Sequence, residues 1–536
     1  MFNKFKKKII YLILSILFVL ILYSLVSPLS KSNKDLDPSK TIYIGGTFSK
    51  KLGLNPIFTP TSDNYLLFPF IFSSLIDFNE KAEAIGDVAE EWIISDDNKS
   101  ITFKLKNNIF FHDGNPLTVK DVKWTYENML LFQNTYYSFI NRIEILNKTT
   151  IKFYFNRTVF SPQFYFNVSI VPAHLGTNKK DSDFGLNPVG SGHYIFSHID
   201  KNENILLKRN ENYYKNKGKA KYIYFKYYPN NEAKWSGFMR KEIDLYRRLS
   251  NKQQKIVKET PWCSLLKTNS VNYYIMVLDK ENPFLNNKNV RSAIDMSIDR
   301  REIINTDPFI NADEMFSPLP VNSPYFNTAL KKRAYDPKKA ITILHNEGFK
   351  DNDKILEKNG TPFILDLYTF NYCINEDLIA KIIKLQLYKI GVLVNIINNK
   401  NYEEIIEIKT RSKTPISFIA SKPSVTTQLP FIYWLKDIDN SFFSLDRSDE
   451  YTNTYLDAIK TVDIDEKKVL FNKLQNIIND EKTSLFLLFP SHIYAFNDRL
   501  DLSGISIASY FTIGNLTKIH INKGGRYEAK GHKKRR

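Results

Sequence analysis

The pattern of apolar and polar residues predicts a strand, a tight turn and a helix within one short stretch of the chain. Residues 101–106 alternate between apolar and polar, which is the period of a half-buried strand. The apolar run 109–111 predicts a second short strand, and His112-Asp113-Gly114-Asn115 predicts the turn that closes it. Thr118 precedes Asp121 by three residues, the spacing of a capping box at a helix N-terminus. The helix that follows has one apolar face, at positions 119, 122, 126 and 129.

Strands and helices of this kind alternate along the rest of the chain. Short apolar segments predict strands at 41–44, 271–278, 392–394 and 485–489. Amphipathic segments predict helices at 290–298, 378–390 and 467–478. Gly391 directly follows the second of these helices, as glycine often does at a helix C-terminus. The alternation, in a chain of 536 residues, predicts an α/β fold with more than one domain.

The first 40 residues have the pattern of a targeting segment. Four lysines between positions 4 and 8 precede an apolar run from Ile9 to Val26. This run is long enough to span a bilayer, and no small residues mark a convincing cleavage site. We therefore expect an uncleaved signal-anchor rather than a cleaved signal peptide. The lysines would stay inside and the body of the chain would be exported. We expect it in the periplasm or at the outer face of the cytoplasmic membrane, anchored by residues 9–26 or released after cleavage.

The net charge of +18 is concentrated at the two ends of the chain. Residues 1–40 contribute +5 and the C-terminal residues 523–536 contribute +6, which leaves +7 for the body. A body of this charge does not favour nucleic-acid binding, so we expect no nucleic-acid partner and read 523–536 as a solvated basic tail. The two cysteines, Cys263 and Cys373, could form a disulfide in an exported protein or remain two buried thiols, and their spacing leaves both possibilities open.

Motifs of catalysis and of metal or nucleotide binding are missing from the sequence. No GxxxxGK, HExxH or GxSxG pattern occurs, and the eight histidines lack the spacing of metal ligands. His193 and His198 are five residues apart, which does not place them on one helix face. His112-Asp113 belongs to the predicted tight turn rather than to a catalytic pair. We therefore expect no enzyme, no catalytic residue, no metal and no cofactor.

The stretch from Gly86 to Met129 resembles the signature of the family 5 extracytoplasmic solute-binding proteins. These are the peptide, nickel and oligosaccharide receptors of ATP-binding-cassette importers. The matching segments are Ala89-Glu90-Glu91-Trp92, Ser95-Asp96-Asp97, Thr102-Phe103-Lys104-Leu105-Lys106, Phe111-His112-Asp113-Gly114 and Pro116-Leu117-Thr118. Asn187-Pro188-Val189-Gly190-Ser191-Gly192-His193-Tyr194 resembles the family's NPVGTGPY turn, in which Gly190 and Gly192 would supply backbone angles that other residues resist. Such resemblance recurs from about residue 41 to 505.

The resemblance implies a two-lobed fold of the type II periplasmic binding proteins with an extra domain, preceded here by an N-terminal transmembrane or signal helix. The implied divisions are 1–40 for the signal and linker; 41–72, 186–263 and 484–522 for lobe I; 73–185 for the extra domain; 264–483 for lobe II; and 523–536 for the tail. Two crossover strands would join the lobes, near 264–280 and 478–490. A ligand would lie between the lobes.

The resemblance also implies a ligand site within Tyr433-Trp434-Leu435-Lys436-Asp437-Ile438-Asp439-Asn440-Ser441-Phe442-Phe443. In peptide-binding members, a strand containing a tryptophan leads to an aspartate that holds the ligand's α-amino group. Trp434 and Asp437 match that placement, and Asp439 is the alternative carboxylate. Asn440 belongs to the same loop. The chain departs from the family in lacking the proline of this loop and in placing Lys436 beside Asp437.

The function that the resemblance implies is a receptor for a short peptide, acting as a monomer with permease subunits of an importer in the cytoplasmic membrane. Two alternatives stay open. The same fold could bind another solute, such as a nickel complex, haem or an oligosaccharide. The chain could also be a membrane-anchored sensor or interaction protein that no longer serves transport.

Overall fold

The computed structural model describes most of residues 36–522. The segments outside the described residues are 1–35, 48–52, 58–65, 80–82, 133–136, 160–161, 177–182, 248, 270–271, 307–310, 320, 322, 324, 333, 371–375, 401–416, 424–448, 462, 504–512 and 523–536. The expected signal-anchor, Cys373 and the basic tail all fall in these segments. Among the residues that are described, no helix is long and apolar enough to cross a membrane.

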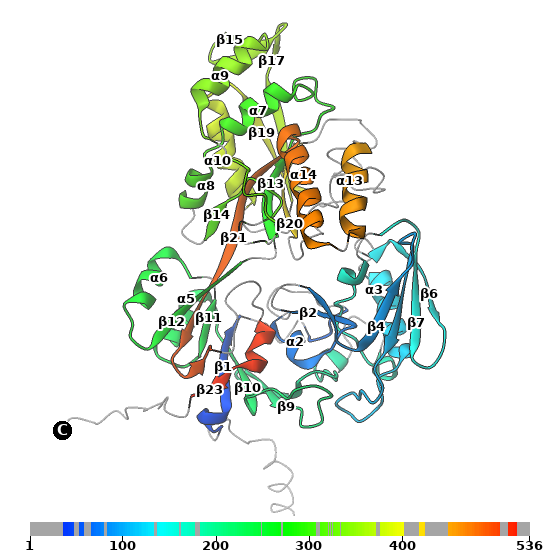
Figure 1. Ribbon diagram of the computed structural model, residues 1–536. Coiled ribbons are helices and arrows are strands. Elements are labelled where there is room, and N and C mark those ends of the chain that lie inside the picture. Colours follow the sequence, from blue (N-terminus) through cyan, green and yellow to red (C-terminus); the bar gives the residue numbers. More distant parts are fainter. Residues whose placement is uncertain are drawn as a thin grey trace, which may run out of the picture.

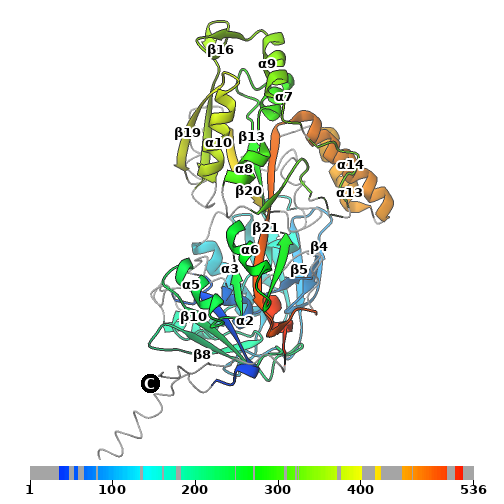
Figure 2. The ribbon, with the colours of Figure 1, turned by 90° about the vertical axis from the view of Figure 1, so that its left-hand side faces the viewer.

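Within the described residues, one twelve-stranded sheet passes through both halves of the molecule (Figures 1 and 2). Its order is β19-β18-β20-β13-β21-β11-β1-β10-β9-β8, and β12 and β14 pair with β21 beside this path. The strands are β1 (Thr41–Gly46), β8 (Tyr194–Ile199), β9 (Ile205–Arg209), β10 (Tyr222–Tyr227), β11 (Leu245–Arg247), β12 (Cys263–Asn269), β13 (Asn272–Val277), β14 (Ala312–Glu314), β18 (Ile364–Phe370), β19 (Leu393–Lys400), β20 (Ser417–Pro423) and β21 (Ser484–Asn497).

The lower half in Figure 1, called the basal lobe below, is built on β1 and β8–β12. Parallel pairing of β1 with β10 buries Ile42 and Ile44, because these residues point to the same face of the strand. The helices of this lobe are α2 (Phe68–Ile71), α5 (Asn231–Met239) and α6 (Asn251–Lys258). Ser250 caps α6 in a capping box with Gln253.

The side domain lies beside the basal lobe and contains the stretch whose pattern predicts a strand, a turn and a helix (Figure 1). Its antiparallel sheet has the order β4-β5-β7-β6, with α3 (Val119–Phe132) packed against it. These strands are β4 (Ala89–Ile94), β5 (Ser100–Leu105), β6 (Ile140–Ile145) and β7 (Thr150–Phe155). The side domain shares one apolar core with the basal lobe, since Ile101 and Phe103 belong to the same buried cluster as Ile42 and Ile44.

The upper half in Figure 1, called the distal lobe below, is covered by helices on both faces of its part of the sheet. One buried cluster lies under α7 (Lys288–Met296), α8 (Arg300–Thr306), α9 (Pro337–Asn346) and α10 (Glu376–Tyr388). The other lies under α13 (Asp449–Lys460) and α14 (Ile464–Glu481). Because both faces are covered, the strands here read as apolar runs rather than as strict alternation.

The remaining elements are short. They are β2 (Ile76–Phe78), β3 (Ala84–Gly86), β15 (Lys350–Asn352), β16 (Ile355–Lys358), β17 (Thr361–Pro362), β22 (Leu500–Asp501), β23 (His520–Ile521) and the 3-10 turns η3 (Pro38–Lys40), η6 (Pro162–Tyr165), η7 (Ala173–Leu175), η8 (Asp183–Gly185) and η9 (Ile513–Lys518).

Most of the elements predicted from the sequence pattern are confirmed. Thr118 and Asp121 form the expected cap of α3, in which the Thr118 amide and hydroxyl both donate to Asp121 Oδ2 at 2.8 Å. The predicted strand 109–111 is wrong, because only Phe110 forms a bridge, to Pro116. The two bonds of this bridge run from the Phe111 amide to the Asn115 carbonyl and from the Leu117 amide to the Ile109 carbonyl, and the pairing stops there because the turn lies on one side and Asn108, in a left-handed conformation, on the other.

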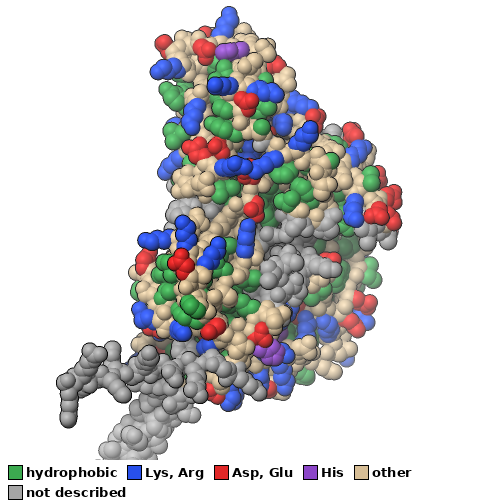
Figure 3. All heavy atoms as spheres, turned by 60° about the vertical axis from the view of Figure 1, so that its left-hand side comes forward, with side chains coloured by type: hydrophobic (Ala, Val, Ile, Leu, Met, Phe, Trp, Pro, Cys, Tyr) green, Lys and Arg blue, Asp and Glu red, His purple; other side chains and the backbone are tan. Residues whose placement is uncertain are grey.

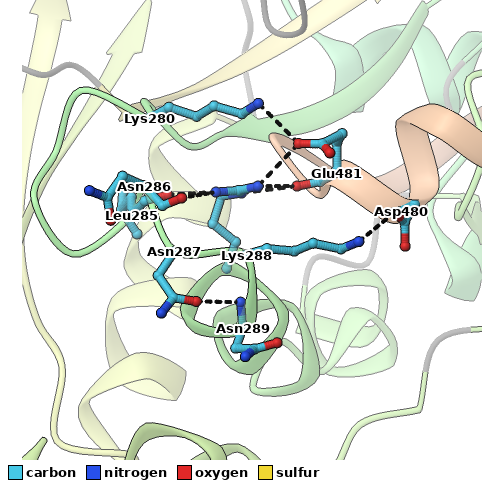
Figure 4. A network of polar contacts seen from close by, with 9 residues as sticks. Lys280, Leu285, Asn286, Asn287, Lys288, Asn289, Asp480 and Glu481 are labelled. Carbon is cyan, nitrogen blue, oxygen red and sulfur yellow. Dashed lines mark hydrogen bonds and ion pairs between the residues drawn. The ribbon is translucent and has the colours of Figure 1, made fainter. Parts of the chain in front are cut away.

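Arg291 on α7 fixes the end of α14, and its partners are drawn in Figure 4. The guanidinium donates from Nε and Nη2 to the Glu481 carbonyl, at 3.0 and 2.6 Å, and from Nη1 to the carbonyls of Leu285 and Asn286. Lys280 pairs with the Glu481 carboxylate at 3.0 Å. Arg291 is buried, and its donors are satisfied by carbonyls that end a helix and a turn. This contact therefore holds α14 where β21 begins.

The two family-like motifs meet at His112. Its amide donates to the Gly190 carbonyl at 2.8 Å, its Nδ1 accepts from the Gly190 amide at 3.3 Å, and its Nε2 lies 3.1 Å from the Gly192 carbonyl. A neutral ring with its proton on Nε2 satisfies both ring contacts. The side chain therefore joins two loops and does not pair with Asp113, which contacts His174 instead.

Gly190 and Gly192 are required for space and not for unusual backbone angles. Neither has a positive φ, so that expectation from the resemblance is wrong. A Cβ on Gly190 would lie 2.0 Å from the carbonyl oxygen of Ile71, and one on Gly192 would lie 2.6 Å from that of Phe70. The turn is pressed against α2, and only glycine allows this approach.

Replacing His112 with Phe is expected to reduce the loss of stability that acid causes. Burial lowers the pKa of His112 from 6.5 to about 4, against smaller opposing effects of the Gly192 carbonyl and Asp113. The unfolded chain therefore binds more protons than the folded chain between these values, and stability falls as the pH drops from about 6.5 to about 4. Urea unfolding at pH 7.5 and pH 5 should show a smaller difference in the variant.

His193 is the internal reference for this experiment. Burial lowers its pKa to about 4 as well, so part of the pH dependence should remain after His112 is replaced. At pH 7.5 the variant should also lose about 1–3 kcal/mol, because the Gly190 amide is left without its acceptor. An unchanged difference between the two pH values would contradict this role for His112.

Candidate functional site

The sequence-predicted site residues Trp434, Asp437, Asp439 and Asn440 lie outside the described residues. The chain leaves the described part of the distal lobe at Pro423, the end of β20, and re-enters it at Asp449, the start of α13. Pro423 is paired with Asn272, the first residue of β13. The segment that carries the predicted site therefore starts beside the strands that connect the two lobes.

Two strand connections cross between the lobes at the same level. β12 leads directly into β13, and β21 runs antiparallel to both (Figure 2). Residues 484–488 of β21 pair with β13 in the distal lobe, and residues 491–497 pair with β12 in the basal lobe. We call the crossing point, defined by Asn269, Asn272, Pro490 and Ser491, the pivot.

The partners of β21 change at Pro490. Proline has no backbone N–H and cannot donate to a ladder, so it suits a position where one set of partners ends and another begins. The first crossover matches the sequence-based expectation. The second begins later than the expected 478, because α14 continues to Glu481 and is closed by Lys482 in a left-handed conformation.

Asn311 joins the lobes beside the pivot. It directly precedes β14 of the distal lobe, and its side chain accepts a hydrogen bond from Gln254 Nε2 on α6 of the basal lobe at 2.6 Å. Its own Nδ2 donates to the Leu249 carbonyl at 3.2 Å, and its carbonyl accepts from the Ser491 amide at 2.6 Å. These contacts form a third, non-covalent connection between the lobes, in addition to the two strand crossings.

The face around this connection is basic. Figure 3 shows many Lys and Arg side chains at the level where the two lobes meet. Lys267 of the basal lobe lies 3.2 Å from Asp313 of the distal lobe, and Arg301 and Lys332 both contact Glu314, at 2.8 and 2.7 Å. Burial raises the pKa of Glu314, but these two cations outweigh that effect and lower it. The Lys267–Asp313 pair is exposed on both sides and therefore stabilises the arrangement little.

Sequence reasoning missed Asn311 and Gln254. They are 57 positions apart, and neither belongs to a periodic pattern or a motif. No local signal could have paired them, because the contact depends on how β14 and α6 are placed by β21. His193 and His198 have different neighbours: the His193 ring packs on Tyr213, with 4.0 Å between the ring centroids, and His198 Nδ1 lies 3.2 Å from Ser197 Oγ.

The described part of the chain contains no group of three or more His, Cys, Asp or Glu side chains placed to hold a metal ion. What the arrangement can do is mechanical. Two lobes whose strand connections cross at one level can change their relative orientation at the pivot, because the rotation is confined to the residues where the strands change partners.

Comparison with known proteins gives a family match over much of the chain. The family model "Bacterial extracellular solute-binding proteins, family 5 Middle" matches residues 83–443, which is more than half of the sequence. Among curated proteins, the probable D,D-dipeptide-binding periplasmic protein DdpA of Escherichia coli is 25% identical over 437 residues, covering 77% of this chain and 80% of that protein.

Solved structures have the same fold. NikZ from Campylobacter jejuni, in complex with Ni(L-His), covers 90% of this chain and 100% of its own, with a TM-score of 0.64 at 21% identity. The oligopeptide-binding protein AppA from Bacillus subtilis, in complex with a nonapeptide, covers 90% of this chain and 99% of its own, with a TM-score of 0.64 at 20% identity. These likenesses establish the two-lobed α/β architecture of periplasmic binding proteins.

Proposed function

The chain belongs to the bacterial extracellular solute-binding proteins of family 5, and from this premise we propose that it captures a short peptide between its two lobes and delivers it to the permease of an ATP-binding-cassette importer. Members of this family are solute-binding receptors rather than enzymes. The relatives include proteins named for the binding of dipeptides, oligopeptides, nickel and haem.

The observation that carries the proposal is the double crossing at the pivot. Two strand connections at one level, with a partner change at Pro490, let one lobe rotate against the other without breaking either core. The basal and distal clusters are separate, so a rotation would leave the packing inside each lobe unchanged. Closure around a solute is the action that this connection permits.

Trp434 and Asp437 are the residues that we propose to contact the ligand, with Asp439 and Asn440 in the same loop. Their placement after β20 supports the proposal, since β20 ends beside the pivot and therefore at the boundary between the lobes. A carboxylate at such a boundary suits the α-amino group of a peptide, because a charge-assisted hydrogen bond is stronger where water is excluded.

The remaining predictions concern the localisation, oligomeric state, partner and domain boundaries of the protein. Export, retention by residues 9–26, a monomeric state and a permease partner accord with a receptor of this family. The division into lobe I, lobe II and an extra domain at the boundaries given above also stays a prediction. The fold accommodates it, since β1, β8–β11 and the end of β21 come from distant parts of the chain and form one lobe.

Ligand released from the native protein should be a short peptide. Full-length protein purified without denaturation, then unfolded, should release peptides that mass spectrometry identifies. Adding the identified peptide back to refolded protein should raise the melting temperature by mass action and make the protein more compact in small-angle scattering. An unrelated soluble protein purified in the same way controls for carry-over.

The other outcomes separate the alternatives. If the released solute is a nickel complex, haem or a saccharide, the proposal that the protein is a solute receptor stands, and the proposal that its ligand is a peptide is rejected. Tight binding with an unchanged scattering curve would reject closure. No released solute, together with no thermal shift from peptides, nickel–histidine or haem, would reject solute binding and favour the membrane-anchored sensor.

A further inference from the structure

The side domain contacts the distal lobe through η6, and Phe164 takes part in this contact. Phe164 is half-buried and packs against the apolar cluster beneath α13 and α14. That cluster contains Tyr451 and Tyr455 of α13 and Phe471 of α14. In both ribbon views α13 lies next to the side domain (Figures 1 and 2). A side chain of the side domain therefore completes an apolar surface of the other lobe.

The segment that carries Phe164 is held firmly inside the side domain. The Phe164 ring stacks on Phe78 at a centroid distance of 5.6 Å and an interplanar angle of 13°. The next ring, Tyr165, packs on Phe139 at 4.8 Å, and Phe166 is fully buried in the core of the side domain. With its neighbours anchored in this way, Phe164 reaches the distal lobe without ordering a loop, so the contact costs little conformational entropy.

Tyr165 also lies close to the distal lobe. Burial raises the pKa of Tyr455 well above its ordinary value, and the nearby Tyr165 phenol raises it further. Two consecutive residues of η6 thus lie near the same apolar cluster, to which Tyr455 belongs, so the contact involves more than one side chain.

The contact lies away from the pivot. In Figure 1, β14 and α6, which the Asn311–Gln254 bond connects, lie on one side of β21, whereas α13 and the side domain lie on the other. When two bodies rotate about a pivot, contacts close to it change little and contacts far from it separate first. Opening of the lobes would therefore undock Phe164 while Asn311 keeps its partners.

The contact is also weak enough to be reversible. It uses one half-buried phenyl group, and Gln163 Oε1 beside it is buried without a hydrogen-bond partner among the described residues. An unsatisfied buried acceptor costs free energy, so an opening that brought water to Gln163 would offset part of what burial of the phenyl group contributes.

We propose that Phe164 is a latch that holds the distal lobe against the side domain and sets how long a solute stays enclosed. The latch contact itself does not depend on which solute is bound. Its effect on residence time rests on the proposed function, in which closure encloses a ligand. Phe164 is thus a positioning residue that acts through the relative orientation of the lobes.

The latch is tested by distances between spin labels in the ligand-free, full-length protein. The labels are attached at Ile93→Cys in the side domain and Val469→Cys on α14, whose native side chains are 70% and 66% exposed. The background carries Cys263→Ala and Cys373→Ala, so that only the two introduced cysteines react. Phe164→Ala should give longer and broader label distances than the parent. Phe164→Leu, which keeps an apolar contact, should restore most of the parent distribution.

Two further variants control for other effects. Phe110→Ala removes an exposed ring of the same domain and should leave the distances unchanged. Ile101→Ala truncates a buried side chain of the side-domain sheet and reports any change due to destabilisation alone. Identical distributions for Phe164→Ala and the parent, or the same change in Ile101→Ala as in Phe164→Ala, would overturn the latch.

A second measurement addresses residence time, with tri-alanine as the probe. Phe164→Ala should release tri-alanine about three- to tenfold faster in stopped-flow experiments, the effect of losing roughly half of a buried aromatic contact. If Phe164→Ala lengthens the label distances but leaves the rate of tri-alanine release unchanged, the contact between the lobes is supported and its role in residence time is rejected. Absence of tri-alanine binding to the parent would count against the peptide proposal, while the label distances alone would still decide the latch.

Discussion

Replacing Asp295 with Asn is expected to lower the free energy of unfolding by about 3–5 kcal/mol, because the buried Arg300 and the partly buried Lys482 would lose the carboxylate that they contact. Asp295 on α7 is buried. Its Oδ1 lies 2.6 Å from Arg300 Nη2, and its Oδ2 lies 3.2 Å from Lys482 Nζ. Removing one charge from a buried group of ions costs far more than removing one from an exposed pair, because the remaining charges are not solvated by water.

The Asp295 group also determines how β21 is attached to the distal lobe. Arg300 Nε donates to the Phe486 carbonyl of β21 at 2.6 Å, and Lys482 closes α14 immediately before that strand. The loss of stability in Asp295→Asn should therefore be largest in the distal lobe. It should appear as faster hydrogen exchange at β21 as well as in the global unfolding transition. Urea unfolding monitored by circular dichroism measures the free energy, and exchange measurements locate it.

The matched control is Asp480→Asn in the same lobe. Asp480 forms an ion pair with Lys288 in which both side chains are largely exposed, so this variant should change the free energy of unfolding by less than about 1 kcal/mol. Equal, small effects of Asp295→Asn and Asp480→Asn would show that the buried group is not a stabilising centre.

Replacing Asp437 with Ala is expected to weaken peptide binding by at least about thirtyfold. If the carboxylate pairs with the α-amino group of an enclosed peptide, its removal leaves a buried cation without a partner, and such losses amount to roughly 2–5 kcal/mol. At 1.4 kcal/mol for each tenfold change, the lower value corresponds to about thirtyfold. Isothermal titration calorimetry with the co-purified peptide measures the change.

Peptide acetylation supplies the complementary test. An N-acetylated peptide has no α-ammonium group, so it should bind the parent protein poorly and respond little to Asp437→Ala. Asp439→Ala tests the register of the loop, since the proline that family members have there is missing. If Asp439→Ala abolishes binding while Asp437→Ala does not, the register is shifted. Equal binding of acetylated and free peptide, with neither variant weakened, would reject amine recognition by this loop.

The local elements could be predicted from the sequence because their causes are local. The alternation at 101–106 and the cap at Thr118 depend on neighbours within a few residues, and both are confirmed. The predicted strand 109–111 failed because the pairing is limited to one bridge between the turn and the left-handed Asn108, and apolar content alone does not determine how far pairing extends. The predicted ligand site rests on resemblance, and its four residues lie outside the described part of the chain.

The sequence by itself determined the α/β class, the positions of most strands and helices, and the family, because periodicity and contiguous motifs survive without knowledge of the fold. Only the tertiary structure decided what those motifs touch. His112 meets Gly190 across 78 positions, Asn311 meets Gln254 across 57, and Phe164 reaches the cluster under α13. Such contacts depend on how β21 and the shared cores place distant segments, and no spacing within the sequence encodes that placement.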